Sequence, residues 1–371
     1  MKRRVPGSPA GWARRARKFS DGILRRKGLR VLVTGHRGYI GSVLTKVLAN
    51  ARFDVVGLDT DLYKGCDFGR ISDDVPSFDT DIRDIEFADL VSFDAVVHLA
   101  ALTNDSATLD TGLINEINHT ATIRLAECCK KAGVSRFIFA SSCSVYGRSA
   151  RRIVDEESPV EPIGPYAQSK LRCEHDLLRL AGGAFAPVIM RNATVYGASP
   201  RLRMDIVVND FVASAVARGR ITMRTAGGAW RPFVHVEDLA RVYAAILTAP
   251  DDVVTGQIFN VNPPDDNYRI ASVADLVAEQ IPPTTWTASD AVFDERSYRV
   301  DGSKLLATLP KFRYRWSLNV GIRQLRNALS GTGVTPGEWR SDRYRRSLRL
   351  QKLIEAGRLS RDLRLTETAA A

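Results

Sequence analysis

Residues 30–41 read Arg30-Val31-Leu32-Val33-Thr34-Gly35-His36-Arg37-Gly38-Tyr39-Ile40-Gly41. The run before Gly35 is apolar and rich in β-branched residues, which predicts a buried strand. After Gly38, apolar residues recur at the spacing of one helical face: Ile40, Val43, Leu44, Val47 and Leu48. A strand, a glycine-rich turn and a helix start together predict a phosphate site, because glycines let the backbone approach a pyrophosphate and the helix N-terminus offers unpaired N–H groups.

The next predicted strand indicates which dinucleotide binds. The apolar run Asp54-Val55-Val56-Gly57-Leu58 ends at Asp59, and an acid about 20 residues past the glycines suits the 2′-hydroxyl of an adenosine ribose. The same carboxylate would repel a 2′-phosphate. The sequence therefore predicts NAD, in preference to NADP, as the cofactor.

Strand and helix patterns alternate as far as about residue 190. Residues 94–99, 136–140 and 187–191 are predicted to be buried parallel strands, and helical patterns occupy 112–132 and 165–181. This alternation favours an α/β fold with a doubly wound parallel (Rossmann) sheet. Further along, elements shorten and prolines become frequent, which indicates a smaller lobe over the carboxyl ends of the strands.

Three residues are predicted to be catalytic: Ser142, Tyr166 and Lys170. Tyr166 and Lys170 are four residues apart and share one face of the predicted helix. An ammonium beside a phenol stabilises the phenolate and lowers the phenol pKa. Ser142 can bridge the phenol oxygen and a substrate hydroxyl. Together they can take a proton from an alcohol while a hydride leaves its carbon.

The chain resembles the extended short-chain dehydrogenases/reductases of the NAD-dependent sugar-nucleotide epimerase/dehydratase family, from about Arg30 to about Asn327. The motifs that carry the resemblance are the glycine turn, Asp59, Asp81-Ile82-Arg83-Asp84, His98-Leu99-Ala100-Ala101, Asn118, the Ser142 string, Tyr166-x-x-x-Lys170, Arg191 before Val195-Tyr196-Gly197, and residues 231–240. The resemblance implies an NAD-binding Rossmann domain of residues 30–191 and 231–261. It also implies a smaller, discontinuous substrate-binding lobe of residues 192–230 and 262–330.

The resemblance also implies a binding role for particular residues. Those for the cofactor are Gly35, Gly38, Tyr39, Ile40, Gly41, Asp59, Asp81, Ile82, Leu99, Ala100, Ala101, Asn118, Tyr166 and Lys170. Those for a nucleotide-diphosphate sugar are Thr103, Ser142, Asn192, Thr194, Arg231, Arg296 and Arg299. Thr194 stands where family epimerases often carry an asparagine, and Asn192 lies two residues earlier. The choice between Arg296 and Arg299 for the diphosphate stays open, and Thr103 is equally suited to capping a helix.

The residues after Ser142 narrow the reaction. Family 4,6-dehydratases carry Asp-Glu there, whereas this chain has Cys143 and Ser144. The resemblance therefore implies epimerisation at C4, by transient oxidation to a keto-sugar and return of the hydride. A net NAD(H)-dependent oxidoreductase acting on a nucleotide sugar is the alternative, and a non-catalytic NAD-binding scaffold is a more distant one. Cys143 is interpreted as a small buried residue.

Composition limits the remaining possibilities. His98 and His235 stand in apolar, strand-like contexts and are interpreted as structural, and no His/Cys/Asp cluster has metal-ligand spacing, so no metal is predicted. The five cysteines, an odd number, favour a reducing, cytoplasmic location. No apolar run reaches the ~18 residues of a transmembrane helix. A homodimer through a helix pair is a further expectation from the family.

Positive charge is concentrated in the first 30 residues. The net charge is +11, and residues 1–30 hold eleven Lys/Arg and a single acid, Asp21. Residues 1–29 are predicted to be a flexible extension, with a membrane-surface or nucleic-acid contact as the alternative, and no specific nucleic-acid partner is expected. Residues 331–371 are expected to form a helical extension whose apolar stripe is Tyr344, Leu348, Leu353 and Ile354.

Overall fold

The computed structural model describes residues 28–69, 75–103, 110–289, 295–330, 332, 335 and 337–366, with the backbone alone at 150–152. The predicted extension 1–29 therefore lies outside the described residues, apart from Gly28 and Leu29. Within the described residues, no helix combines the length and the apolar character needed to cross a membrane.

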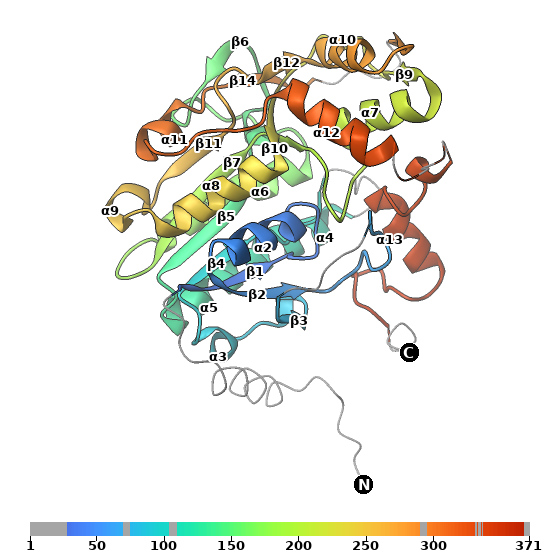
Figure 1. The fold of residues 1–371 in the computed structure, drawn as a ribbon. Helices are drawn as coiled ribbons and strands as arrows, with labels where there is room; N and C mark the ends of the chain where they lie inside the picture. The colour runs from blue at the N-terminus through green and yellow to red at the C-terminus, as the bar shows by residue number, and fades with distance from the viewer. Residues whose placement is uncertain are drawn as a thin grey trace.

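A seven-stranded parallel sheet forms the centre of the molecule (Figure 1), in the order β11-β7-β5-β4-β1-β2-β3. Its strands are β1 (Arg30–Thr34), β2 (Asp54–Asp59), β3 (Ser77–Asp79), β4 (Ala95–His98), β5 (Arg136–Ser142), β7 (Ala186–Asn192) and β11 (Ile258–Val261). β1 pairs in parallel with β2 on one side, Arg30 opposite Asp54, and with β4 on the other, Val31 opposite Ala95. The strand order reverses between β1 and β4, which is where doubly wound sheets bind their ligands. The predicted α/β fold is confirmed.

Both faces of the sheet are buried at its centre, which explains why central strands such as β1 and β4 are almost continuously apolar. Val31 and Val33 pack on one face and Leu32 on the other. The first face is covered by α2 (Gly41–Asn50) and α8 (Val236–Thr248), which contact each other. The second is covered by α3 (Phe87–Leu90), α5 (Ala121–Ala132) and α6 (Pro165–Leu180).

The helix predicted over 112–132 is interrupted. It consists of α4 (Thr111–Asn115), a π-helical turn η2 (Glu116–Thr120) and α5. Single π-helical turns are rare in proteins, and those that occur are often found at functional sites. This one brings Asn118 inward, to 1% exposure.

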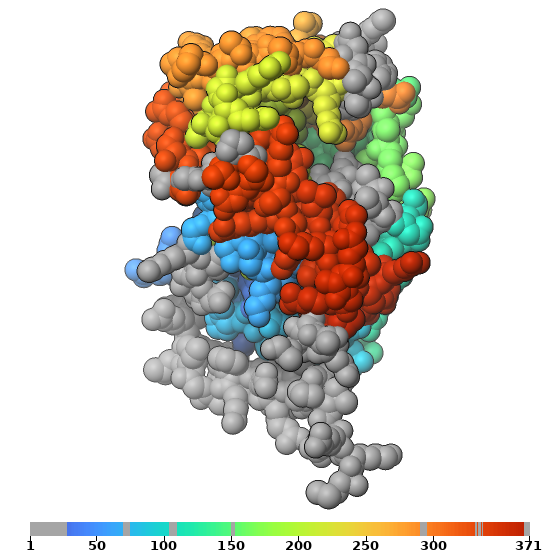
Figure 2. Space-filling view, turned by 90° about the vertical axis from the view of Figure 1, so that its right-hand side faces the viewer, coloured from blue at the N-terminus to red at the C-terminus, as the bar shows by residue number. Residues whose placement is uncertain are grey.

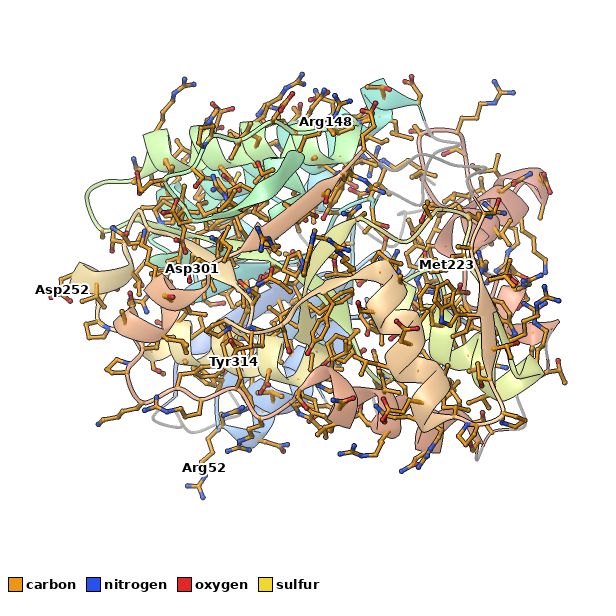
Figure 3. All side chains as sticks on the ribbon, turned by 90° about the horizontal axis from the view of Figure 1, so that it is seen from above. Arg52, Arg148, Met223, Asp252, Asp301 and Tyr314 are labelled. Carbon is orange, nitrogen blue, oxygen red and sulfur yellow. The ribbon has the colours of Figure 1, made fainter. Side chains whose placement is uncertain are left out.

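A smaller lobe lies over the carboxyl ends of the strands (Figure 1). Its elements are β6 (Arg148–Val154), β8 (Thr194–Tyr196), α7 (Val207–Arg218), β9 (Arg220–Thr222), β10 (Trp230–His235), β12 (Asn267–Arg269), α10 (Ile270–Gln280), β13 (Thr285–Thr287), β14 (Ser297–Val300), α11 (Ser303–Thr308) and α12 (Leu318–Ser330). β10 pairs with β8 and β12, so within residues 231–261 it is α8, α9 (Asp251–Val254) and β11 that return to the large sheet. Figure 3 views this lobe from above, with Arg148 and Asp301 marking the two ends of the β6–β14 pair.

The C-terminal segment packs on the body of the protein (Figure 2). It contains the 3₁₀ turn η4 (Glu338–Arg340) and α13 (Arg346–Glu355) and then continues without a helix to Thr366. Tyr344 and Leu353 are buried as expected, but the predicted place of Leu348 in the apolar stripe is wrong, because it is 41% exposed. Leu350 is buried in its stead, since it lies three residues before Leu353 on the face that packs inward.

Candidate active site

The glycine turn between β1 and α2 fits closely against the loop after β4. Gly35 has a φ of +71°, and a Cβ at this position would lie 2.8 Å from the Ala100 nitrogen. A Cβ at Gly41 would lie 2.2 Å from the Gly35 carbonyl oxygen. Only glycine meets both conditions, so these residues hold the turn open beside the start of α2.

A cavity lies next to this turn, at the point where the strand order reverses. Its lining includes Gly35, Gly38, Asp59, Asp81, Ile82, Leu99, Ala100 and Ala101, eight of the residues expected to bind cofactor. The loops that supply them follow β1, β2, β3 and β4, whose carboxyl ends meet at one edge of the sheet. The structure thus brings together residues from four separate sequence motifs.

Asp59 lies on the wall of this cavity and is held by backbone donors. Its carboxylate accepts hydrogen bonds from the Arg37 N–H (3.0 Å) and the Asp61 N–H (2.9 Å). Burial raises the pKa of Asp59. A carboxylate oriented by two N–H groups keeps unused lone pairs, which suits it to accept hydrogen bonds from ribose hydroxyls.

Asp81 also lines this cavity. It caps the 3₁₀ turn η1 (Ile82–Asp84) by accepting from the Arg83 N–H at 2.8 Å. The Arg83 guanidinium also donates to Asp81, at 2.8 Å from Nη2. Arg83 itself lines the cavity, so this arginine adds a positive charge that the sequence reasoning did not assign to the site.

Three further residues that are expected to bind the cofactor support the wall of the cavity. The Tyr39 hydroxyl donates to the Gly197 carbonyl at 2.7 Å and so ties the glycine turn to the smaller lobe. Ile40 precedes α2 and packs against the core. The Asn118 side chain donates to the Leu102 carbonyl (2.9 Å) and accepts from the Leu102 N–H (2.7 Å). It therefore fixes the loop after β4.

Ser142, Tyr166 and Lys170 meet above the end of β5. The Ser142 hydroxyl lies close enough to the Tyr166 phenol to lower the pKa of that phenol, and Ser142 Oγ accepts from the Ser144 N–H at 3.1 Å. Lys170 is 2% exposed, with Nζ 4.6 Å from the centre of the Phe139 ring and 5.7 Å from that of Tyr166. Within the described part of the chain, its ammonium makes ring contacts and no ion pair.

Burial controls the protonation of this group. It raises the pKa of Tyr166 to about 12, against the opposing effect of the Ser142 hydrogen bond. It lowers the pKa of Lys170 to about 8. The expectation that Lys170 lowers the phenol pKa stays a prediction; in this structure burial of the phenol outweighs the lowering effect of Ser142.

Arginines expected to hold the diphosphate gather between β10 and β14. Arg231 Nη1 donates to the Trp230 carbonyl at 2.8 Å and to the Arg296 carbonyl. Its guanidinium carbon lies 5.2 Å from the centre of the Tyr298 ring, and that of Arg299 lies 5.2 Å from the Trp230 ring. The structure brings Arg231, Arg296 and Arg299 together without separating the roles of the last two.

Tyr298 is a site residue that sequence reasoning missed. Besides its contact with Arg231, it lies near enough to Tyr166 to influence the Tyr166 pKa, in the raising direction. It therefore connects the phenol with the arginines. The sequence offered one signal for Tyr298: it stands directly between Ser297 and Arg299, in a stretch whose arginines are expected to bind the diphosphate.

The other expected substrate residues are more scattered. Asn192 Nδ2 donates to the Tyr243 hydroxyl at 2.9 Å, so this side chain is engaged with α8. Thr194 begins β8 and is half-buried, and Thr103 is the last described residue of the loop after β4. Neither is placed among the arginines by the contacts described above.

His98, His235 and Cys143 are buried, which agrees with the structural roles expected of them. His98 lies between the Thr34 and Thr122 hydroxyls, at 2.7 and 2.8 Å, and burial lowers its pKa to about 3. The Cys143 thiol is buried and donates to the Arg191 carbonyl, and burial raises its pKa. None of the five cysteines is in a disulfide. The described residues contain no cluster of His, Cys, Asp and Glu able to hold a metal.

A doubly wound sheet with this glycine turn, Asp59, and the Ser142, Tyr166 and Lys170 set defines an extended short-chain dehydrogenase/reductase. A sequence model of the NAD dependent epimerase/dehydratase family matches residues 31–262, and the chain belongs to this family of NAD-dependent nucleotide-sugar enzymes.

Relatives catalyse more than one reaction. The chain is 32% identical over 239 residues to the UDP-glucose 4-epimerase of Azospirillum brasilense, across 59% of this chain and 68% of that protein. It is 28% identical over 264 residues to the dTDP-D-glucose 4,6-dehydratase of Mus musculus, across 68% of this chain and 72% of that one. The family is therefore established, and the particular reaction has to be argued from the site.

Solved structures share both fold and cofactor. MoeE5 in complex with UDP-glucuronic acid and NAD superposes with a TM-score of 0.70 at 27% identity, covering 81% of this chain and 98% of that one. The NAD complex of UDP-glucose 4-epimerase from Thermus thermophilus gives 0.66 at 27% identity, covering 81% and 100%. The residues described here fit NAD: the glycine turn for the pyrophosphate, Asp59 for the adenosine ribose, and the buried Lys170 ammonium for a further hydroxyl.

Proposed function

We propose that this protein is a nucleotide-sugar 4-epimerase. The observation that carries the proposal is the combination of the Ser142 hydroxyl and the Lys170 ammonium, both beside the Tyr166 phenol, with the absence of any carboxylate at positions 143 and 144. The first provides for reversible oxidation of an alcohol. The second removes the acid and base that elimination of water would need.

The protein groups have separate tasks in this proposal. Ser142 orients the C4 hydroxyl, Tyr166 takes its proton, and Lys170 stabilises the resulting phenolate. NAD⁺, when bound, would supply the hydride acceptor and donor. Arg231, with Arg296 or Arg299, holds the diphosphate, because a guanidinium pairs with phosphate oxygens through two parallel N–H groups. The sugar is then able to present either face of the ketone.

Dehydration is disfavoured by the contacts of the two residues after Ser142. The Cys143 thiol is turned to the Arg191 carbonyl, and Ser144 is buried at the base of the same turn. Burial raises the pKa of Cys143, so its thiol stays protonated at neutral pH and does not supply the base that elimination needs.

The test uses purified protein, heavy water and a panel of UDP-, dTDP- and GDP-hexoses, with products read by NMR and no cofactor added. An epimer at C4 without solvent deuterium is the expected result. Deuterium at C3 or C5 would contradict it and indicate enolisation. Product formed only after NAD(H) is supplied would support a net oxidoreductase.

We also propose that the protein forms a homodimer and is located in the cytoplasm.

A further inference from the structure

The C-terminal segment Glu338–Thr366 lies against the cofactor cavity, although it is outside the residues that define the family, 31–262. Figure 2 shows its atoms spread across those of the N-terminal half of the chain. Because more than 70 residues of sequence separate it from the family region, its contacts with the cavity are a property of this chain that the family motifs do not specify.

One residue of this segment forms part of the cavity wall. Leu363 lines the cavity together with Asp59, Ile82 and Ala100. It is 2% exposed and packs in a small apolar cluster with Leu102, Leu353 and Leu359. Leu102 also lines the cavity. The cluster thus joins the C-terminal segment directly to the loop after β4.

Polar contacts hold the segment to other wall residues. Arg83 Nη1 donates to the Asp362 carbonyl at 2.9 Å. The Arg364 guanidinium pairs with Asp84, at 3.1 Å from Nη2, and lies 3.6 Å from the Asp81 carboxylate. The residues on both sides of Leu363 are therefore attached to the turn that supplies Asp81 and Ile82.

A second attachment lies at the other side of the cavity. The Arg346 guanidinium carbon lies 4.3 Å from the centre of the Tyr63 ring, and Tyr63 is a wall residue. Arg349 Nη2 donates to the neighbouring Lys64 carbonyl at 2.8 Å. The segment thus spans the cavity from the loop after β2 to the turn after β3.

The backbone conformation of Leu363 indicates that its side chain has a functional role. Its φ is +59°, in the left-handed region that glycine and asparagine adopt at little cost. A leucine in this conformation is disfavoured, and it is kept here by the turn in which the Leu363 N–H donates to the Ser360 carbonyl at 3.0 Å. Such outliers cluster at ligand sites.

We propose that Leu363 is a cofactor-binding residue and that residues 338–366 form a strap over the adenosine half of the NAD site. Leu363 supplies an apolar surface for the adenine ring, opposite the ribose acceptor Asp59. The strap slows dissociation of the dinucleotide. This inference rests on NAD as cofactor and is independent of which sugar reaction follows.

The test compares Leu363→Ala with Leu359→Ala in the full-length protein. Leu359 is equally buried in the same cluster and does not line the cavity, so it controls for loss of packing. Affinities for NADH, ADP-ribose and nicotinamide mononucleotide are measured by titration calorimetry, and NADH release by the change in its fluorescence during a chase.

For Leu363→Ala we expect the Kd of NADH and of ADP-ribose to rise about tenfold, which is ~1.4 kcal/mol, with a similar rise in the release rate. Binding of nicotinamide mononucleotide should be unchanged, and Leu359→Ala should shift the three constants less than about twofold. Equal effects of the two variants, or none, would overturn the proposal. Should Leu363→Ala fail to fold, Leu363→Asn, which suits the left-handed backbone, makes the same test. If Leu363→Ala retains epimerase activity but releases NADH faster, the change concerns cofactor binding alone. This result is distinguishable from failure of the proposed function.

Discussion

The Arg191 guanidinium and the Glu174 carboxylate form a buried ion pair next to the residues proposed to be catalytic. Arg191 Nη2 lies 2.8 Å from Glu174 Oε2, with side-chain exposures of 4% and 1%. Glu174 also accepts from the Ser141 hydroxyl, and Arg191 Nη1 donates to the Tyr146 hydroxyl at 2.9 Å. The pair joins α6, which carries Tyr166 and Lys170, to β7 and to the end of β5, which carries Ser142.

Glu174→Gln should therefore destabilise the fold strongly, since it leaves the Arg191 charge buried without its partner. Removal of one partner of a buried pair costs about 3–5 kcal/mol, measurable by urea unfolding. Glu338→Gln breaks the exposed pair with Arg343 and should cost under about 1 kcal/mol. If the two variants lose the same stability, the buried pair does not have this role. The double variant Glu174→Gln/Arg191→Met should recover part of the loss.

Tyr166→Phe should reduce turnover by about 10²–10⁴-fold, the usual contribution of a general acid–base group. NAD affinity should remain within about twofold of the normal value, because the ring keeps its packing. Tyr314→Phe is the control, since it removes a buried hydroxyl that has no partner among the described residues. Substantial activity in the Tyr166→Phe protein would show that another group takes the proton.

Asp59→Asn should weaken NAD binding about tenfold or more, as expected for loss of a hydrogen bond to a charged group. It should also narrow the preference for NAD over NADP, because the repulsion of a 2′-phosphate disappears. Asp79→Asn alters an exposed carboxylate that pairs with Arg37 and should leave the preference intact. Calorimetric titration of each variant with NAD and with NADP measures this preference. If Asp59→Asn leaves the preference for NAD unchanged, another residue discriminates between the two dinucleotides.

Stability should fall in mild acid because of His98. Its pKa is lowered to about 3 in the folded protein, against about 6.5 in an unfolded chain. Below the latter value the unfolded chain binds a proton that the folded protein does not, so the free energy of unfolding decreases as pH falls. Linkage gives about 2 kcal/mol lost from this residue between pH 7.5 and pH 5.

His98→Asn removes this titration. The free energy of unfolding of the wild type minus that of the variant should therefore be about 2 kcal/mol smaller at pH 5 than at pH 7.5. His235, whose pKa is also lowered by burial, is present in both proteins and cancels. A difference that does not vary with pH would mean that His98 is accessible to protons in the folded state.

Arg231→Gln should raise KM for the nucleotide sugar about tenfold or more with a smaller change in kcat, because a diphosphate contact is made in ground and transition states alike. Arg269→Gln is the control, since Arg269 stacks on Trp230 from the neighbouring strand β12. The same kinetics on Arg296→Gln and Arg299→Gln would identify which of them shares the diphosphate. A normal KM for Arg231→Gln would remove it from the substrate site.

Much of the fold was predictable from local patterns. The glycine turn, Asp59 and the alternating strands and helices are encoded within short windows, since strand burial on both faces and helical periodicity are local properties. Tyr166 and Lys170 were recognisable because one helix places both. Leu348 was misassigned for the opposite reason: which side of a short basic helix faces inward depends on what it packs against.

Sequence alone determined the doubly wound sheet and the glycine turn, and it was sufficient to propose Ser142, Tyr166 and Lys170 as catalytic residues. Tertiary structure decided that burial raises the pKa of Tyr166 and lowers that of Lys170, that Tyr298 lies near both Tyr166 and Arg231, and that Leu363 lines the same cavity as Asp59. The positions of Tyr298 near Tyr166 and of Leu363 near Asp59 depend on segments more than 100 residues apart in the chain coming together. A linear pattern carries no information about desolvation or about contacts between such distant segments, because both arise only once the chain has folded.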